Sequence, residues 1–230
     1  LLDAIDYSLI RANPKIFLGY SDITALHLAF QKKAGLVTFH GPVLLSGFSD
    51  YTVKWFRAAL FDPKPLGVMT NPPEQNQLRP RHPIRTIAAG RAEGRLCGGN
   101  LTLIATTMGT PYEIETQDRL MLLEDIGEQP YSVDRMLTQL RLAGKLSAAA
   151  GIVLGECNDC GPRDFKPSRA SVYSYDEVVD NLLRPLGKPV MSGLTFGHTA
   201  DQLTIPLGVR ARVDAAKGTL EILESGTAKR

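Results

Sequence analysis

Residues 17–30, FLGYSDITALHLAF, hold the pattern that decides the fold. A short apolar run leads into Gly-Tyr-Ser-Asp, and apolar residues then recur at helical spacing. Strand, tight turn and helix have the outline of a nucleophile elbow, which exposes the Ser21 hydroxyl and sets the Asp22 N–H at a helix N-terminus to donate to an oxyanion. The ordinary alternative is that Ser21 or Asp22 only caps the helix. Because Ile23 stands where G-x-S-x-G has its second glycine, this stretch alone favours the cap.

The residues around this stretch predict an α/β fold with a parallel sheet. A first helix ends at Asn13-Pro14, because a residue before proline is steered out of the helical region. Short apolar runs at 16–18 and 37–39 have strand character, and residues 22–33 between them have helical spacing. Strands that alternate with helices are typical of parallel α/β sheets.

The rest of the chain divides into a proline-rich segment and a second α/β region. Six of the fifteen prolines lie between residues 62 and 83, which favours an extended linker. We therefore predict a first domain over 1–61, a linker over 62–91 and a second domain over 92–230. In the second domain we expect a helix capped by Asn100, strands at 120–123 and 151–154, a helix at 133–140, a helix with a Ser174/Glu177 capping box, and a β-rich tail at 203–224.

Composition excludes several classes of function. The 230 residues carry 26 Lys and Arg against 24 Asp and Glu, so no basic footprint for nucleic acid or for an acidic membrane is present. No apolar run approaches the roughly 20 residues of a membrane-spanning helix. The three cysteines, an odd number, argue against a disulfide framework and for a reducing compartment.

A serine nucleophile needs a base and an acid that orients the base. Among the four histidines, His27 lies on an apolar helix face and is expected in the core, and His82 lies in the linker and is expected to be solvated. His40 follows a strand and either lines a site or caps one. His198, in a loop beside Gly197, is the best candidate base by context. Glu124, directly after an apolar strand, is the best candidate acid, with Asp125 and Glu128 as competitors.

Two other motifs offer weaker alternatives. Cys157 and Cys160 form a C-x-x-C that, with Cys97, could supply three thiolates for zinc, but no second pair and no His-x-x-x-His accompanies it. Gly98-Gly99-Asn100 either receives an anion at a helix N-terminus or is a turn needed for tight packing. We keep Gly99, Asn100 and His40 as candidate substrate contacts, and we expect no metal site and no cofactor. No P-loop and no G-x-G-x-x-G is present.

Five blocks run in order along almost the whole chain: GYSDITALH, TFHGP, GGNL with GTPYE, LLEDIGEQPYSVDRMLTQL, and FGH with LTIPLG. Together they resemble successive blocks of the LD-carboxypeptidase family of serine peptidases. The resemblance implies a triad of Ser21 as nucleophile, His198 as base and Glu124 as orienting acid. It also implies the C-terminal part of an N-terminal α/β domain, a C-terminal swivelling β/α/β domain, and a site where the two meet.

The family also implies a substrate and a setting. The expected reaction releases terminal D-alanine from a muropeptide by hydrolysis of an L,D-peptide bond in cell-wall recycling, in a cytoplasmic homodimer that needs no cofactor. Family members carry a long segment before the position of Leu1, including a glycine-rich loop that supplies a second oxyanion donor. The chain opens without Met and with helical spacing, so we expect such a segment here and leave a signal peptide open.

Two other functions fit the same residues. The related microcin C immunity hydrolases cleave an amide in a peptidyl- or aminoacyl-nucleotide, which needs an aromatic surface for the base. The only tryptophan, Trp55, lies in a helix-like stretch and is expected in the core, which favours the muropeptide. A non-catalytic muropeptide-binding relative is the other alternative, and the complete set of Ser21, Glu124 and His198 speaks against it.

Overall fold

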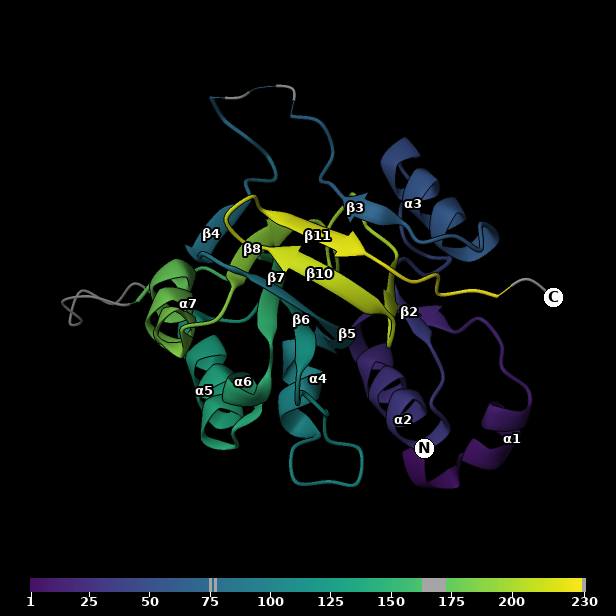
Figure 1. The fold of residues 1–230 in the computed structure, drawn as a ribbon. Helices are drawn as coiled ribbons and strands as arrows, with labels where there is room; N and C mark the ends of the chain where they lie inside the picture. Colours follow the sequence, from purple (N-terminus) through teal and green to yellow (C-terminus); the bar gives the residue numbers. More distant parts are fainter. Residues whose placement is uncertain (75, 77, 163–172, 229–230) are drawn as a thin grey trace.

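The computed structural model describes residues 1–74, 76, 78–162 and 173–228, and their strands form two sheets (Figure 1). Short 3-10 turns precede α1 and α2 and follow α7. The helices are α1 (Tyr7–Ala12), α2 (Thr24–Ala34), α3 (Asp50–Phe61), α4 (Leu101–Thr106), α5 (Pro130–Leu142), α6 (Lys145–Ala148) and α7 (Tyr175–Leu183). The strands are β1 (Leu18–Gly19), β2 (Thr38–His40), β3 (Gly67–Met69), β4 (Arg85–Ala88), β5 (Arg91–Asn100), β6 (Arg119–Ile126), β7 (Gly151–Asn158), β8 (Val190–Leu194), β9 (Ile205–Leu207), β10 (Arg210–Asp214) and β11 (Thr219–Ile222).

The larger sheet has a parallel centre and antiparallel edges. Its eight strands run in the order β3-β11-β10-β5-β6-β7-β8-β4, and β5, β6, β7 and β8 are parallel to one another. The hairpin of β10 and β11 and the strands β3 and β4 pair antiparallel at the two sides. The carboxyl ends of the four parallel strands therefore lie at one edge, which is where α/β proteins gather functional groups.

The smaller sheet brings together the two ends of the chain. Its strand order is β1-β2-β9, with β1 parallel to β2 and β9 antiparallel to β2. Strand β9 lies only eleven residues after β8, the large-sheet strand that precedes it in the chain. The loop between β8 and β9 therefore crosses from the large sheet to the small one.

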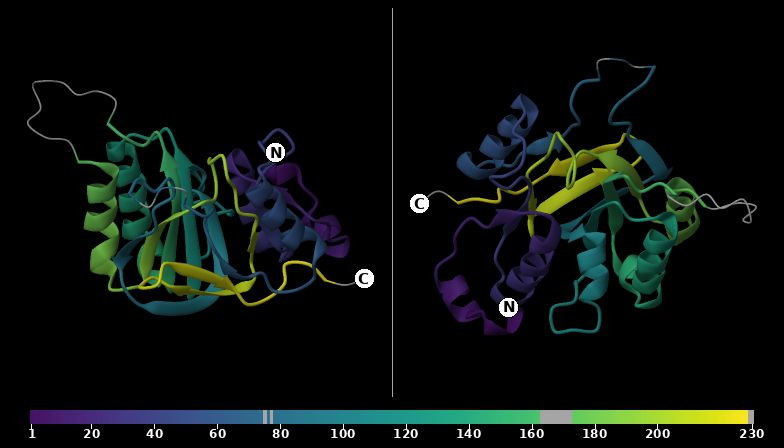
Figure 2. Two further views of the ribbon diagram at one scale, coloured as in Figure 1. Left: turned by 90° about the horizontal axis from the view of Figure 1, so that it is seen from above. Right: turned by 180° about the vertical axis from the view of Figure 1, so that it is seen from behind.

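Two apolar cores pack against opposite faces of the large sheet. Helices α4, α5, α6 and α7 gather on one face, and the same grouping is visible in both views of Figure 2. The other face is covered by α3 through Trp55, by β9, and by the β10–β11 hairpin. Side chains of β6 alternate between the cores, because successive residues of a strand point to opposite faces: Met121 and Leu123 join the first, Leu120 and Leu122 the second.

Local sequence signals explain where several helices begin and end. Ser174 and Glu177 form the expected capping box of α7, and Asn100 accepts the N–H of Leu103 to cap α4. Helix α2 ends at Gly35, which has φ +67°, a conformation that glycine adopts without strain. The α/β class predicted from the sequence is confirmed, as is the β-rich tail at 203–224, which holds β9, β10 and β11.

The proline-rich segment differs from its prediction. Residues 62–91 were expected to form an extended linker, yet they contribute β3 and β4 to the large sheet. Both strands are short and pair on one side only, and such edge positions tolerate nearby prolines, which cannot donate to a ladder. The domain bounds at 1–61 and 92–230 stay a prediction.

The cysteines also differ from expectation. Cys157 and Cys160 form a disulfide around the turn that follows β7, whereas Cys97 is free and buried in β5. The odd count of three cysteines argued against a disulfide framework. That count does not bear on a single C-x-x-C pair, because its two cysteines can bond within one turn. No helix among the described residues is long and apolar enough to span a membrane.

Candidate active site

Ser21 lies at a strained turn between β1 and α2. Its φ is +63°, a left-handed conformation uncommon for a residue with a side chain. Ser21 opens a 3-10 turn, Ser21–Ile23, that runs directly into α2. Neither the turn nor the helix has a side-chain cap hydrogen bond, so the capping interpretation of Ser21 is wrong. Strain of this kind persists only where the surroundings impose it, and it gathers at functional sites.

Close backbone packing holds this turn. The Gly19 carbonyl accepts hydrogen bonds from His27 Nε2 (2.9 Å) and from the N–H of Gly41 (3.1 Å). A Cβ atom on Gly19 would lie 2.7 Å from a methyl of Ile23, too close to be accommodated. His27 is fully buried, as predicted, and its ring ties α2 to the strand before the elbow.

The start of α2 is clamped onto the large sheet. Thr24 Oγ1 accepts the Asn100 N–H at 3.0 Å. Gly99 has φ +139°, and a Cβ atom there would lie 2.6 Å from the same Thr24 oxygen. The absence of a side chain at Gly99 therefore lets the elbow approach the end of β5.

The two acids after the β6 apolar run face opposite ways. Glu124 continues the side of Leu120 and Leu122 and faces the small sheet, where it is buried. Asp125 faces α4 and accepts hydrogen bonds from Asn100 Nδ2 (3.0 Å) and from the N–H and hydroxyl of Thr102. Asp125 is therefore committed to the start of α4, which leaves Glu124 as the acid that can orient a histidine.

His198 lies in the loop that crosses between the sheets. Its Nδ1 is 2.8 Å from Glu124 Oε2. The preceding Gly197 has φ +89°, and a Cβ atom there would overlap the Glu124 carboxylate. Asn158, at the end of β7, donates from Nδ2 to the His198 carbonyl at 2.5 Å. The position of His198 is thus fixed by the contact of its ring with Glu124, by the hydrogen bond from Asn158 to its carbonyl, and by the close packing of Gly197.

Burial and charge act on the two groups in opposite directions. Burial raises the pKa of Glu124, and the hydrogen bond and charge of His198 offset only part of that effect. For His198, burial lowers the pKa, but the hydrogen bond and charge of Glu124, together with the charges of Asp125 and Asp22, outweigh it, so the pKa of His198 lies above its ordinary value. The carboxylate thus favours a charged imidazolium, the form a general base takes once it accepts a proton.

The Tyr20 ring brings the elbow and the base together. Its centroid lies 4.9 Å from that of the His198 ring, edge to face. Asp22, on the other side of Ser21, is close enough for its charge to raise the pKa of His198. No hydrogen bond joins Ser21 to His198 within the described ranges; such contacts are often long without substrate and tighten in the complex.

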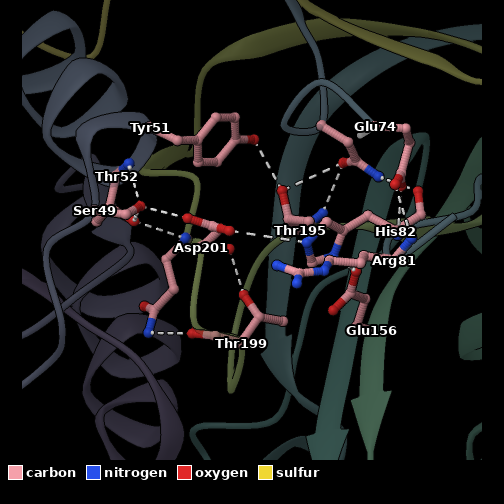
Figure 3. A network of polar contacts seen from close by, with 12 residues as sticks. Ser49, Tyr51, Thr52, Glu74, Arg81, His82, Glu156, Thr195, Thr199 and Asp201 are labelled. Atoms are coloured by element: carbon pink, nitrogen blue, oxygen red, sulfur yellow. Dashed lines mark hydrogen bonds and ion pairs between the residues drawn. The ribbon is translucent and has the colours of Figure 1, made fainter. Parts of the chain in front are cut away.

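A polar network lies beside the His198 loop (Figure 3). His82 Nδ1 is 2.5 Å from Glu156 Oε1, and His82 Nε2 is 3.8 Å from Asp201 Oδ2. Asp201 also accepts from the hydroxyl of Ser49, the N-cap of α3. The prediction that His82 is solvated is therefore wrong: its ring is nearly buried and joins the segment before β4 to β7 and to the loop.

The three candidate substrate contacts all lie close to other residues of the site. Asn100 caps α4 and bonds Asp125, Gly99 packs on Thr24, and His40 is buried with its Nε2 3.8 Å from Glu124 Oε1. Across residues 1–74, 76, 78–162 and 173–228, no group of three or more His, Cys, Asp or Glu side chains is arranged to hold a metal ion. The disulfide also removes Cys157 and Cys160 from the zinc alternative.

Two family models match the chain. The LD-carboxypeptidase N-terminal domain matches residues 1–41, and the LD-carboxypeptidase C-terminal domain matches residues 93–213, more than half of the chain. The chain belongs to the LD-carboxypeptidase family. The resemblance seen in the sequence is thereby confirmed.

Individual relatives of this LD-carboxypeptidase chain differ in what their names say. A probable murein peptide carboxypeptidase of Bacillus subtilis is 40% identical over 98% of this chain and 67% of its own length. The structure of MccF in complex with glutamyl sulfamoyl guanosine has a TM-score of 0.84 at 29% identity, covering 99% of this chain and 73% of MccF. That of muramoyltetrapeptide carboxypeptidase from Oxalobacter formigenes has a TM-score of 0.78 at 31% identity, covering 99% and 74%. The chain thus spans about two thirds of the Bacillus relative.

Sequence reasoning about this LD-carboxypeptidase chain missed three features of the site. It did not assign a role to Tyr20, although the tyrosine stands inside the GYSD block. It kept His40 as a candidate substrate contact without indicating that its ring is buried, and it gave Asn158 no role. No local signal identifies Asn158, because its partner lies 40 residues away along the chain.

Proposed function

We propose that the chain carries the catalytic groups of a serine carboxypeptidase that releases terminal D-alanine from muropeptide tetrapeptides by hydrolysis of an L,D-peptide bond. Ser21 is the nucleophile, His198 the general base and Glu124 the acid that orients it. The observation that carries the proposal is the combination of Ser21 at φ +63° on a strand–turn–helix with the 2.8 Å contact between His198 and Glu124.

The proposed reaction proceeds through an acyl-enzyme. Because Nδ1 of His198 is bound to Glu124, its Nε2 takes the Ser21 proton as Oγ attacks the scissile carbonyl. The resulting oxyanion accepts from the Asp22 N–H, and one such donor is worth roughly 3 to 4 kcal/mol in the transition state. His198 then gives the proton to the departing D-alanine amine. Water, deprotonated by His198, attacks the acyl-enzyme ester and regenerates Ser21.

A substitution of Ser21 tests the nucleophile. In the complete protein with a muropeptide tetrapeptide as substrate, Ser21→Ala should lower kcat for D-alanine release by more than roughly 1,000-fold, with an unchanged midpoint of unfolding. The matched control is Ser147→Ala, on α6, whose hydroxyl bonds only the Gly144 carbonyl. Turnover that survives Ser21→Ala would overturn the triad, and a wild-type protein without D-alanine release would overturn the substrate.

The second candidate is an amide hydrolase that acts on aminoacyl- or peptidyl-nucleotides. It is favoured by the TM-score of 0.84 to MccF, whose structures carry glutamyl sulfamoyl guanosine or aspartyl sulfamoyl adenosine. Against it, Trp55 is buried, as predicted, and offers no open face for a base. Both substrates should be offered to the complete protein; cleavage of the aminoacyl-nucleotide without D-alanine release would favour this candidate.

Two further features are proposed from the family resemblance. We expect a homodimer, which light scattering of the complete protein would detect, and a cytoplasmic location.

A non-catalytic binding role predicts muropeptide binding without turnover in the wild-type protein.

A further inference from the structure

The second oxygen of the Glu124 carboxylate has no hydrogen-bond partner among the described residues. Oε2 is bound to His198, while Oε1 is buried and unpartnered. An ionised carboxylate accepts at both oxygens, and a buried acceptor left unmatched costs free energy. A donor is therefore expected to face Oε1.

His40 is the side chain that faces this oxygen. Its Nε2 lies 3.8 Å from Glu124 Oε1, and both of its ring nitrogens are buried without a partner. The ring is 1% exposed and packs edge-on against Phe196, two residues before His198. The 3.8 Å separation is roughly 0.8 Å beyond a hydrogen bond, and catalytic hydrogen bonds are often long until substrate binds.

The charge state of His40 suits a donor that adds no charge. Burial, and then the nearby His27 and His198, lower the pKa of His40 to about 3. The ring is therefore neutral at physiological pH, with one N–H to donate. A second charged imidazolium beside Glu124 would weaken the attraction that the carboxylate exerts on the proton at His198; a neutral N–H leaves most of that attraction in place.

We propose that His40 is a positioning residue: its neutral ring donates Nε2–H to Glu124 Oε1 and fixes the carboxylate so that Oε2 holds His198 toward Ser21. The inference rests on the proposed function, because it assigns Glu124 the orienting role. It replaces substrate contact as the role of His40, since a buried ring behind the acid does not reach the open side of the site.

Three variants separate positioning from packing. His40→Gln places an amide N–H near the position of Nε2, His40→Asn keeps a donor that falls short of Oε1, and His40→Leu removes the donor. We expect His40→Gln to keep at least a third of kcat. We expect His40→Asn and His40→Leu to lose roughly 10- to 100-fold in kcat with KM within twofold, the size of loss typical when the partner of a positioned ligand is removed.

The pH profile supplies a readout that a packing role would not move. A donor dipole at Oε1 opposes the imidazolium across the carboxylate, so its removal raises the pKa of His198, and the acid limb of kcat/KM moves to higher pH in His40→Asn and His40→Leu. The other titratable groups around the pair are Asp125 on β6, Asp22 at the elbow, His27 on α2 and Tyr175 on α7. None of them is altered by these variants.

Thr38→Val is the matched control. Thr38 lies two residues earlier in β2 and is also buried, and its side-chain oxygen has no hydrogen-bond partner, Glu124 included, among the described residues. We expect it to leave kcat and the acid limb unchanged. Equal losses in His40→Gln and His40→Leu, or an unshifted acid limb in His40→Asn, would overturn the inference.

A measurement without substrate keeps the inference separate from the proposed function. The imidazole of His198 is titrated by NMR in the complete protein and in the Gln and Asn variants, whose folding is checked by thermal unfolding. The inference predicts a higher pKa of His198 in His40→Asn than in wild type and in His40→Gln. A shift without any D-alanine release would leave the inference standing and the proposed substrate wrong; no shift in an active enzyme would do the reverse.

Discussion

Gly197 shows at the scale of one residue how the acid and the base come into contact. Its φ of +89° turns the chain so that the backbone passes directly over the Glu124 carboxylate. A methyl group would occupy the space of that carboxylate, and an L-residue is strained at this φ. The glycine is therefore a condition for the 2.8 Å contact between Glu124 and His198.

We expect Gly197→Ala to disable the site. The clash should displace the carboxylate or the loop, destabilise the fold by roughly 2 to 4 kcal/mol, and lower kcat about 100-fold or more. Denaturant unfolding and D-alanine release measure the two effects. The control is Gly187→Ala: Gly187 also has a positive φ (+65°) but has open space around its Cα, so it should cost only about 1 kcal/mol and leave kcat unchanged. Equal effects on kcat in both variants would refute the argument.

The charge of Glu124 sets the pH dependence of the base. Because Glu124 raises the pKa of His198 against the effect of burial, the acid limb of kcat/KM in the wild type should lie above the ordinary histidine value. Glu124→Gln removes the charge and leaves the burial, so the pKa of His198 should fall and the limb should move to lower pH. The amide that replaces the carboxylate would also favour the wrong tautomer of the His198 imidazole, so kcat should fall by roughly 10,000-fold. A limb that stays in place would argue against this ion pair.

Single residues also mark the limit of prediction from the sequence. The stretch around Ser21, taken alone, favoured an ordinary helix cap, and only the presence of LED and FGH elsewhere in the sequence favoured the interpretation of Ser21 as a nucleophile. Choosing Glu124 over Asp125 depends on which face of β6 each occupies, which follows from strand alternation once the strand and its neighbours are known. His82 was misjudged because its partners, Glu156 and Asp201, are more than 70 residues away.

At the scale of elements, α4 is the joint between the elbow and the large sheet. Its N-cap, Asn100, bonds Leu103 through Oδ1, Asp125 through Nδ2 and Thr24 through its backbone N–H. A capping residue that also donates a hydrogen bond to a buried carboxylate should contribute more to the free energy of unfolding than a cap exposed to solvent.

We therefore expect Asn100→Ala to destabilise the protein by roughly 2 to 3 kcal/mol. The matched variant, Ser174→Ala, removes the exposed capping box that Ser174 forms with Glu177 at the start of α7. It should lower the free energy of unfolding by about 1 kcal/mol. Both are measured by denaturant unfolding. If Asn100 also contacts substrate, KM will rise in addition; a stability loss no larger than that of Ser174→Ala would show that the bond to Asp125 contributes nothing.

Elements with strong local signals were predicted well, and those that depend on distant pairing were not. The capping box of α7 and the hairpin of β10 and β11 each have their signals within a few residues. In contrast, β3 and β4 span only three or four residues each and exist because a distant strand accepts them. The proline content at 62–83 favoured an extended linker and could not reveal that pairing.

At the scale of the whole molecule, the site exists because the chain crosses three times between two sheets. The small sheet carries Ser21 after β1, the large sheet carries Glu124 on β6, and the loop from β8 to β9 brings His198 to both. The relative position of the sheets therefore sets the geometry of the three groups. Contacts that hold the sheets together far from Ser21, Glu124 and His198 should therefore affect the stability of the fold more than they affect kcat.

Tyr51 anchors α3, the helix between β2 of the small sheet and β3 of the large sheet, to the large sheet and to the start of the crossing loop. From α3 its hydroxyl donates to the Thr70 carbonyl after β3 (2.7 Å) and lies 2.8 Å from Thr195 Oγ1 at the start of the His198 loop (Figure 3). Tyr51→Phe removes both bonds with the ring retained and should cost about 1 to 2 kcal/mol, a fall in Tm of roughly 2 to 8 °C.

Because the contact between Glu124 and His198 does not pass through Tyr51, kcat should change little in Tyr51→Phe. Tyr131→Phe serves as the control, since Tyr131 is half exposed on α5 and should shift stability by less than about 0.5 kcal/mol. Calorimetry of the complete protein checks both. If the two sheets unfold as one cooperative unit, the single unfolding transition of Tyr51→Phe moves to lower temperature as a whole. A transition that splits in two, or a kcat that falls as far as stability does, would show that the sheets are not coupled as the structure implies.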